Sequence, residues 1–333
     1  MQKSSLIAIV IVAIVAVGGG AAVLVLNGDS SETADTIVGH TFEYRVVGNH
    51  EDKLVSGTQT LNVLSENDTR YEIKTVREVY TDTSGGTRSV LWNDVKTDWV
   101  KKTDITSPGK FSKDYKLDTY WGAKDAKMYT NTVNGVKTTS YVAFDKISFE
   151  TVVEDGDNLY IYMMDKTDFM KKDKSYTPPK MKITMALSGT MTVSSNPNNK
   201  YSIGGSVETE LIDSTGVAFK FTIREIMLVE GITFSDDTQT VWGYSDSDDS
   251  DDGIKSGTAN VDTIWGNVLT TVYIDTEDGM KKTTYLYKDL PVKMTYSMVD
   301  QHASMEITQT ITEVIVNGVY IDTIKQLDEL ENA

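Results

Sequence analysis

The 333-residue chain contains no cysteine, and it has only five prolines and three histidines. Without cysteine, the chain cannot form disulfides, zinc–thiolate sites, iron–sulfur clusters or a lipidated cysteine anchor. The sequence motifs of serine hydrolases, zinc proteases and phosphate-binding loops are also missing. The sequence therefore predicts a protein without catalytic activity, in which packing and hydrogen bonding stabilise the fold. An extracytoplasmic hydrolase is the least favoured alternative.

Positive charge is scarce as well. The chain has 49 acidic and 32 basic residues, for a formal net charge of −17. Such a charge repels phosphate backbones, so nucleic acid is not expected as a partner. The 39% hydrophobic content nevertheless predicts folded domains with packed cores.

The longest uncharged stretch lies at the N-terminus. Residues 6–26 carry no charge, and a helix of this length spans about 30 Å, the thickness of the hydrocarbon core of a bilayer. Lys3 precedes the stretch and acidic residues follow it, which predicts a cytoplasmic N-terminus and an extracytoplasmic remainder. We expect residues 1–26 to be a transmembrane anchor in the cell membrane and residues 27–36 to be a polar tether. A cleaved signal peptide is the alternative.

The chain also contains an internal duplication. Residues 118–145 align with residues 262–289, and eleven of the twenty-eight positions are identical, including the DT-x-WG pentapeptide at the start of each segment. A spacing of this size matches an ordinary domain and not a solenoid repeat. We expect one domain at 37–177, a Pro-containing joint at 178–180 and a second copy at 181–333.

Within each copy, hydrophobic residues alternate with period two and turn residues interrupt them. The predicted fold class is all-β, with two tandem duplicated antiparallel β domains behind one N-terminal transmembrane helix. Each domain is expected to be a sandwich, a barrel or a curved half-barrel sheet, because period two is common to all three.

One hairpin in each copy defines a candidate binding face. Asn134-Gly135 and Asp278-Gly279 suit two-residue type I′ turns, and such a turn fixes the register of the strands on either side. The register places a polar stripe on one face of each hairpin, formed by Thr132, Lys137, Thr139 and Tyr141 in the first copy and Thr276, Lys281, Thr283 and Tyr285 in the second. These residues form either a repeated binding face for a protein or glycan, or an ordinary solvent-facing strand surface.

The DT-x-WG pentapeptides are interpreted as structural corners of the fold. Their residues are Asp118, Trp121 and Gly122 in the first copy and Asp262, Trp265 and Gly266 in the second. Each tryptophan is expected to anchor a core, and each glycine to permit a bend. Arg77 and Arg224, from the repeated TVREV and TIREI segments, are expected to form ion pairs with the aspartates of these corners.

A dense carboxylate run is the one candidate metal site, and no other cofactor is expected. The run contains Asp246, Asp248, Asp249, Asp251 and Asp252. Calcium favours oxygen ligands, but the spacing departs from that of an EF-hand loop, and a solvated loop is the alternative.

Together these features predict a membrane-anchored extracytoplasmic surface protein whose duplicated β domains bind or display something. A structural subunit of a cell-surface assembly or filament is the alternative function. The expected partners are the membrane, through the N-terminal helix, and an extracellular protein or glycan.

Overall fold

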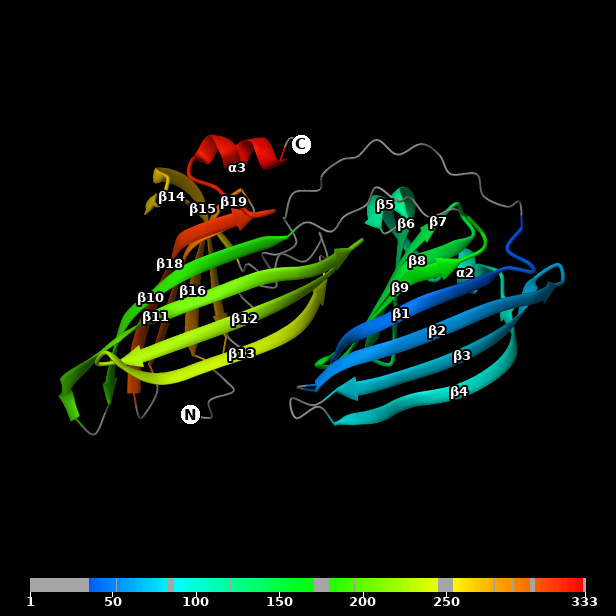
Figure 1. Ribbon diagram of the computed structural model, residues 1–333, viewed down its shortest axis with the longest axis horizontal. Coiled ribbons are helices and arrows are strands. Elements are labelled where there is room, and N and C mark those ends of the chain that lie inside the picture. Colours follow the sequence, from blue (N-terminus) through cyan, green and yellow to red (C-terminus); the bar gives the residue numbers. More distant parts are fainter. Residues whose placement is uncertain are drawn as a thin grey trace.

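Two antiparallel β-sheets follow one another along the chain, as the computed structural model shows (Figure 1). The structure describes residues 36–51, 53–82, 87–119, 121–170, 180–193, 196–244, 254–277, 279–288, 290–299 and 303–331. The expected anchor, most of the tether, Pro178 and Pro179 of the joint, and the carboxylate run lie outside these residues. In the described part of the chain, neither helix is both long and apolar enough to cross a membrane.

The first sheet contains nine strands in the spatial order β4-β3-β2-β1-β9-β8-β7-β6-β5. Its strands are β1 (Thr41–His50), β2 (Lys53–Glu66), β3 (Arg70–Asp82), β4 (Arg88–Lys101), β5 (Lys110–Thr119), β6 (Gly122–Val133), β7 (Val136–Ala143), β8 (Ile147–Asp155) and β9 (Asn158–Thr167). The short helix α2 (Thr103–Thr106) connects β4 to β5.

The second sheet repeats this topology, in the order β13-β12-β11-β10-β18-β17-β16-β15-β14. Its strands are β10 (Met181–Val193), β11 (Asn196–Thr215), β12 (Ala218–Val229), β13 (Ile232–Tyr244), β14 (Ile254–Thr263), β15 (Gly266–Glu277), β16 (Met280–Tyr287), β17 (Leu290–Val299) and β18 (Ala303–Val316). A short strand, β19 (Val319–Tyr320), pairs with β18 and is followed by helix α3 (Ile324–Glu331). The all-β, duplicated organisation predicted from the sequence is therefore confirmed.

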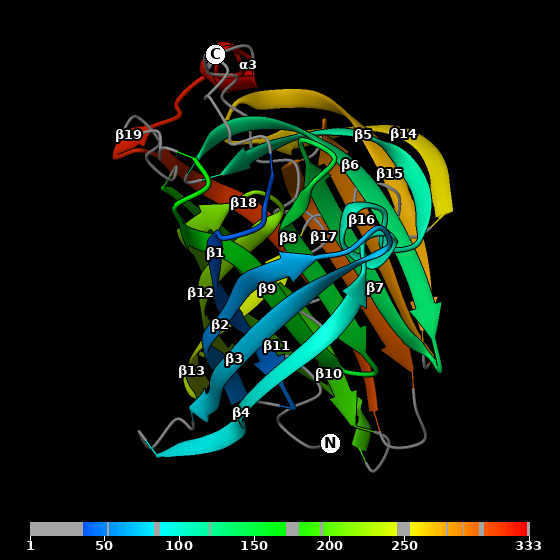
Figure 2. The same cartoon turned by 90° about the vertical axis from the view of Figure 1, so that its right-hand side faces the viewer.

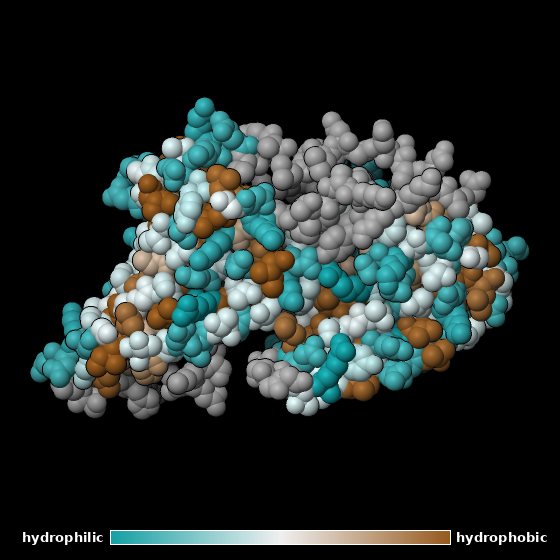
Figure 3. Space-filling view, in the orientation of Figure 1, coloured by the Kyte–Doolittle hydropathy of each residue, from teal (hydrophilic) through white to brown (hydrophobic). Residues whose placement is uncertain are grey.

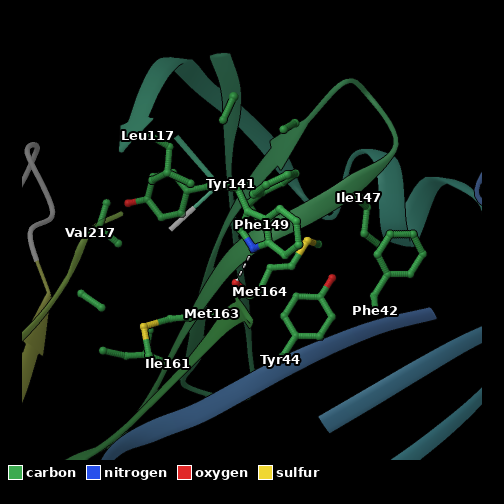
Figure 4. Packing of buried hydrophobic residues seen from close by; sticks show 14 of the residues in the cluster. Phe42, Tyr44, Leu117, Tyr141, Ile147, Phe149, Ile161, Met163, Met164 and Val217 are labelled. Atoms are coloured by element: carbon green, nitrogen blue, oxygen red, sulfur yellow. Dashed lines mark hydrogen bonds between the residues drawn. The ribbon is translucent and has the colours of Figure 1, made fainter. Parts of the chain in front are cut away.

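Each domain is a single curved sheet, as Figures 1 and 2 show. In each sheet the strands form one continuous hydrogen-bonded path, from β4 to β5 and from β13 to β14. The curved-sheet alternative therefore describes these domains, and the sandwich of two separate sheets does not. In the first domain, Phe42 and Tyr44 of β1 lie in one apolar cluster with Ile147 and Phe149 of β8 and Met164 of β9 (Figure 4). We call this side of each sheet its inner face.

The predicted hairpin turn and its register are present. Asn134 and Gly135 both have positive φ angles, of 52° and 86°, as a type I′ turn requires. Thr132 then lies opposite Lys137, and Met128 lies opposite Tyr141, as expected. In the second copy Thr276 pairs with Lys281 and Val272 with Tyr285.

Equivalent positions on the two inner faces differ by one residue from those that the alignment of TVREV with TIREI suggests. Gly57 and Gly205 lie where a neighbouring strand comes very close, since a Cβ would collide with the carbonyl oxygen of Glu78 at Gly57 and of Ile226 at Gly205. Both pairs are separated by 148 residues along the chain, whereas TVREV and TIREI are separated by 147. Arg77 on the first inner face therefore corresponds in space to Glu225, and not to Arg224.

The β11–β12 hairpin of the second domain packs against the opposite, outer face of the first sheet. Val217 and Ala218 at its tip are fully buried in the same cluster as Leu117, Tyr141 and Met163, and Figure 4 shows Val217 beside them. The two domains are thus joined by side-chain packing as well as by the covalent chain.

Polar contacts fix the position of that hairpin. Arg45 of β1 forms an ion pair with Asp213 at 3.0 Å, and its guanidinium lies over the ring of Trp242. The side chain of Asn49 donates to the carbonyl oxygen of Trp242 at 2.7 Å and accepts from its N–H at 3.2 Å. Because an amide pairing with both backbone groups of one residue tolerates little movement, this contact sets the orientation of β13 against β1.

Candidate functional site

The inner face of the second domain is unusually rich in methionine. All eight methionines of this domain belong to one apolar cluster, either at its centre or packed against it: Met181, Met185, Met191, Met227, Met280, Met294, Met298 and Met305. They come from five strands, and each occupies an inward position of its strand. Because methionine is unbranched and polarisable, such a lining adapts its shape to what it contacts.

Polar side chains are buried within this methionine lining. Thr284 of β16 and Gln309 of β18 are both 1% exposed, and both pair in the sheet with Met294 of β17, one from each side. The Thr284 hydroxyl and the Gln309 carbonyl oxygen have no hydrogen-bond partner among the described residues. An unpaired buried polar atom costs about 1–3 kcal/mol, so a face that keeps two of them in one row is suited to a ligand that pairs them.

Two further polar groups lie on the same face. One carboxylate oxygen of Glu225 and the amide nitrogen of Gln239 are likewise buried without a described partner. Glu225 is on β12 and Gln239 is on the neighbouring strand β13, across the curve from β16–β18. The four groups include both hydrogen-bond donors and acceptors. We call Glu225, Gln239, Thr284 and Gln309 the inner polar group.

Electrostatics distinguish the two walls of this face. Burial, reinforced by the neighbouring charge of Asp237, raises the pKa of Glu225 to about 7. Burial and the charge of Glu225 raise the pKa of Tyr296 well above its usual value, and the Tyr296 hydroxyl donates to the sulfur of Met294 at 3.4 Å. Phe221 of β12 belongs to the same buried cluster as Met294 and Tyr296 of β17, so these two strands face each other across the curve. Lys282 is buried on the same wall as Tyr296.

The first domain fills the same face differently. Aromatic rings of Phe42, Phe149 and Phe169 pack there, and the Tyr44 hydroxyl donates to the carbonyl oxygen of Ser148 at 2.8 Å. Arg77 is held by Asp94 of β4 through two hydrogen bonds, each of 2.8 Å. This inner face is therefore packed and its charge is paired, so the two copies of the fold differ in their capacity to bind a ligand.

The expected ion pair between Arg224 and Asp262 is wrong, and Arg77 pairs with a different aspartate from the expected Asp118. Arg77 pairs with Asp94, and Arg224 pairs with Asp236 on β13 at 2.8 and 3.0 Å. In each copy the partner lies on the edge strand next to the strand of the arginine. Side chains on paired strands are close enough to interact directly. Asp262 accepts instead from the side chain of Asn267 at 2.8 Å, and the side chain of Asp118 lies outside the described residues.

The DT-x-WG pentapeptides close two equivalent hairpins. In the β5–β6 hairpin, Thr119 donates to the carbonyl oxygen of Gly122 at 3.1 Å and accepts from the N–H of Trp121 at 3.0 Å. Thr263, Gly266 and Trp265 repeat this arrangement in the β14–β15 hairpin. Each indole then donates to a distant backbone carbonyl, of Met164 at 3.0 Å in the first copy and of Ile321 at 2.8 Å in the second. The glycines have φ angles of 79° and 91°.

The candidate binding face is covered at two of its eight residues. Thr139 and Tyr141 are fully buried, because the second domain packs over the outer face of the first sheet, so the solvent-facing interpretation is wrong for these two residues. The remaining members are half-buried or exposed: Thr132, Lys137, Thr276, Lys281, Thr283 and Tyr285. Lys137 also forms an ion pair with Glu154 at 3.3 Å. The structure therefore does not present these eight residues as one repeated accessible surface.

Metal sites built from conventional ligands are not present in the described ranges, where no cluster of three or more histidine, cysteine, aspartate or glutamate side chains is placed to hold an ion. The acidic run proposed for calcium lies outside those ranges. Sequence reasoning overlooked the methionine-lined face, although its signal was available: Met181, Met185 and Met191 occupy odd positions of one period-two segment, and Met294 and Met298 occupy even positions of another.

No protein-family model and no curated protein sequence matches the chain. Among solved structures, one that aligns with it is the crystal structure of kievitone hydratase from Nectria haematococca, at 10% sequence identity over 88% of this chain and 94% of that chain, with a TM-score of 0.15. Nothing about the fold or the activity of this chain follows from a TM-score that low.

Proposed function

We propose that this chain is a binding module without catalytic activity, and that the inner face of its second domain holds a small, mainly apolar ligand. The observation that carries the proposal is the inner polar group, four polar side chains that each keep a buried atom without a described hydrogen-bond partner inside a methionine-rich lining. Ligand sites combine an apolar lining with a few convergent polar groups in this way. Binding accounts for these groups without any reaction.

A small ligand fits better than the extracellular protein or glycan expected from the sequence. Those partners require an accessible face, whereas Thr139 and Tyr141 of the candidate face are buried. The inner face of the second domain instead buries Thr284 and Gln309 among apolar side chains. The first domain then acts as the platform on which the binding domain is held by the β11–β12 hairpin.

The location proposed for this module is the outer side of the cell membrane. The support is the uncharged stretch of residues 6–26 and the acidic residues that follow it. A tether of about ten residues would keep the two domains near the membrane surface, where apolar molecules are concentrated.

Binding of the neutral fluorophore N-phenyl-1-naphthylamine to a fragment that begins at Thr36 tests the proposal. We expect saturable fluorescence enhancement at one site. The double variant Thr284→Val/Gln309→Leu should bind this probe more tightly, because it has no polar atoms at these two positions that an apolar probe would cover without pairing.

The matched control is Thr139→Val, which alters an equally buried threonine of the first domain. Its affinity for the probe should equal that of the wild type. Folded protein that shows no saturable binding, or a double variant with unchanged affinity, would contradict the proposal.

A further inference from the structure

Four methionines of the second domain lie side by side on four adjacent strands. Met191 of β10 pairs with Met305 of β18, Met305 pairs with Met298 of β17, and Met298 pairs with Met280 of β16. Directly paired residues of antiparallel strands point to the same face. We call Met191, Met305, Met298 and Met280 the methionine row.

The row brings sulfur atoms within reach of one another. Side chains of directly paired residues have Cβ atoms roughly 4.5–5.5 Å apart, and each methionine has three rotatable side-chain bonds beyond its backbone. Two or three thioethers from neighbouring strands can therefore turn toward a common point without movement of the sheet. The backbone ladder that holds the row is formed in all three strand pairs.

The row is both embedded and reachable. Met305 is 9% exposed, and the other three are partly buried against the same apolar cluster. The row lies four residues along β18 from Gln309, so it is separate from the inner polar group. Met185 and Met294, which are deeper in the cluster, are almost fully buried and fill the core.

Core packing alone explains the deep methionines but does not require the alignment of the other four. Leucine or isoleucine would fill a strand end equally well, and they pack with better-defined side-chain conformations. Only methionine adds a soft sulfur donor at each of the four paired positions.

Soft thioether ligands select monovalent copper among the biological metals, whereas carboxylate and carbonyl oxygens select calcium or magnesium. The chain has no cysteine to compete for such an ion, and its net charge of −17 attracts cations to the surface. We propose that the methionine row binds one Cu(I) ion, or its analogue Ag(I), through two or three thioether sulfurs. This site is additional to the small-ligand site proposed above and does not depend on it.

The test uses the full chain in detergent micelles. Ag(I) is titrated calorimetrically, and Cu(I), kept reduced by ascorbate, is titrated in competition with a chromogenic Cu(I) chelator. We expect one ion per chain. The variant Met298→Leu/Met305→Leu should lose affinity by about tenfold or more, a loss of the size expected when ligands are removed.

The matched control is Met181→Leu/Met185→Leu, which changes two methionines of the same cluster that are outside the row. Its affinity should stay within about twofold of the wild type. Thermal melting of each variant confirms that it is folded, since leucine is close to methionine in volume. Absence of binding by the wild type, equal affinity of the row variant, or an equal loss in the control would each overturn the proposal.

X-ray absorption at the copper edge provides a readout of the ligands themselves. A first shell made only of sulfur is expected for the wild type, because the chain offers no thiolate and the row offers thioethers. A shell of nitrogen and oxygen would assign the ion to another part of the chain and reject the row.

Discussion

The carboxylate of Glu150, on the outer face of the first sheet, accepts a hydrogen bond from the backbone N–H of Val217 in the second domain at 3.1 Å. The N–H of Ala218 donates to the same carboxylate. Glu150 is fully buried at this contact, and burial is the main reason that its pKa is raised to about 8. One side chain therefore links the contact between the domains to pH.

The first prediction concerns that linkage. A carboxyl group that ionises at pH 4.5 when unfolded and at about 8 when folded is protonated in the folded protein near neutrality. Ionisation of Glu150 therefore leaves the free energy of unfolding unchanged below pH 4.5 and lowers it progressively between pH 4.5 and about 8. Above that pH it causes no further change. We expect Glu150→Gln to match the wild type near pH 4.5 and to be more stable at pH 9, by on the order of a few kcal/mol.

Denaturant unfolding of both proteins at pH 5, 7 and 9 measures this difference. Taking the difference between the two proteins removes the contribution of all other titrating groups. A difference that is constant with pH would show that Glu150 is ionised at the contact.

The second prediction concerns Gly216, at the tip of the β11–β12 hairpin. Its φ angle is +57°, and a Cβ would collide with the carboxylate of Glu150. Gly216→Ala should therefore cost more than the roughly 1–2 kcal/mol of a left-handed alanine. Gly231, at φ +75°, has no atom within 4 Å of the Cβ position, so Gly231→Ala isolates the backbone cost. Equal free energies of unfolding for the two variants would mean that the Glu150 side chain moves aside at no energetic cost.

The third prediction compares the repeated arginine pairs. The Arg77–Asp94 pair is less exposed than the Arg224–Asp236 pair, and Arg77 also lies over the ring of Trp92. Because solvent screens the more exposed pair, Asp94→Asn should lower the melting temperature more than Asp236→Asn does. Melting curves in low and high salt check the order, and the effect of Asp236→Asn should shrink more than that of Asp94→Asn as salt increases, because the exposed pair is screened more strongly. The reverse order would indicate that Arg77 is satisfied by its ring contact alone.

The fourth prediction concerns the repeated corner. Trp121 is buried and donates to the carbonyl oxygen of Met164, whereas Trp265 is only partly buried and donates to that of Ile321. Trp121→Phe leaves a buried carbonyl unpaired, and it should cost about 1–3 kcal/mol of unfolding free energy. Trp265→Phe should cost less, because water can reach its acceptor. Chemical denaturation followed by far-ultraviolet circular dichroism measures both.

The surface of the molecule is mixed, with no large apolar area on the face seen in Figure 3. Exposed large apolar side chains are spread over many strands, such as Val95 on β4, Leu269 on β15 and Val299 on β17. Scattered apolar side chains are common on the surfaces of folded proteins.

The local features of the fold were readable from the amino-acid sequence. Period-two alternation indicated strands, the Asn134-Gly135 turn predicted its own hairpin, and the register around it was correct to the residue. The repeated pentapeptide revealed the duplication. These features depend on residues within a few positions of one another, and such interactions act wherever the chain is placed.

The partners of the repeated arginines could not be read in the same way. The letters TVREV and TIREI suggest equivalent positions, but the close approaches at Gly57 and Gly205 show that the strands are shifted by one residue. With period two, a shift of one residue moves a side chain to the opposite face. Arg77 therefore faces inward, and Arg224 faces the other side.

By itself, then, the sequence determined the all-β class, the duplication and the local register, because alternation and turn chemistry are properties of short segments. Only the tertiary structure decided that Thr139 and Tyr141 are covered, since a hairpin more than seventy positions away packs on them. It also decided that Met191, Met305, Met298 and Met280 meet in one row. Residues distant in sequence become neighbours only when the strand order is set, and that order depends on how the whole sheet buries its inner face.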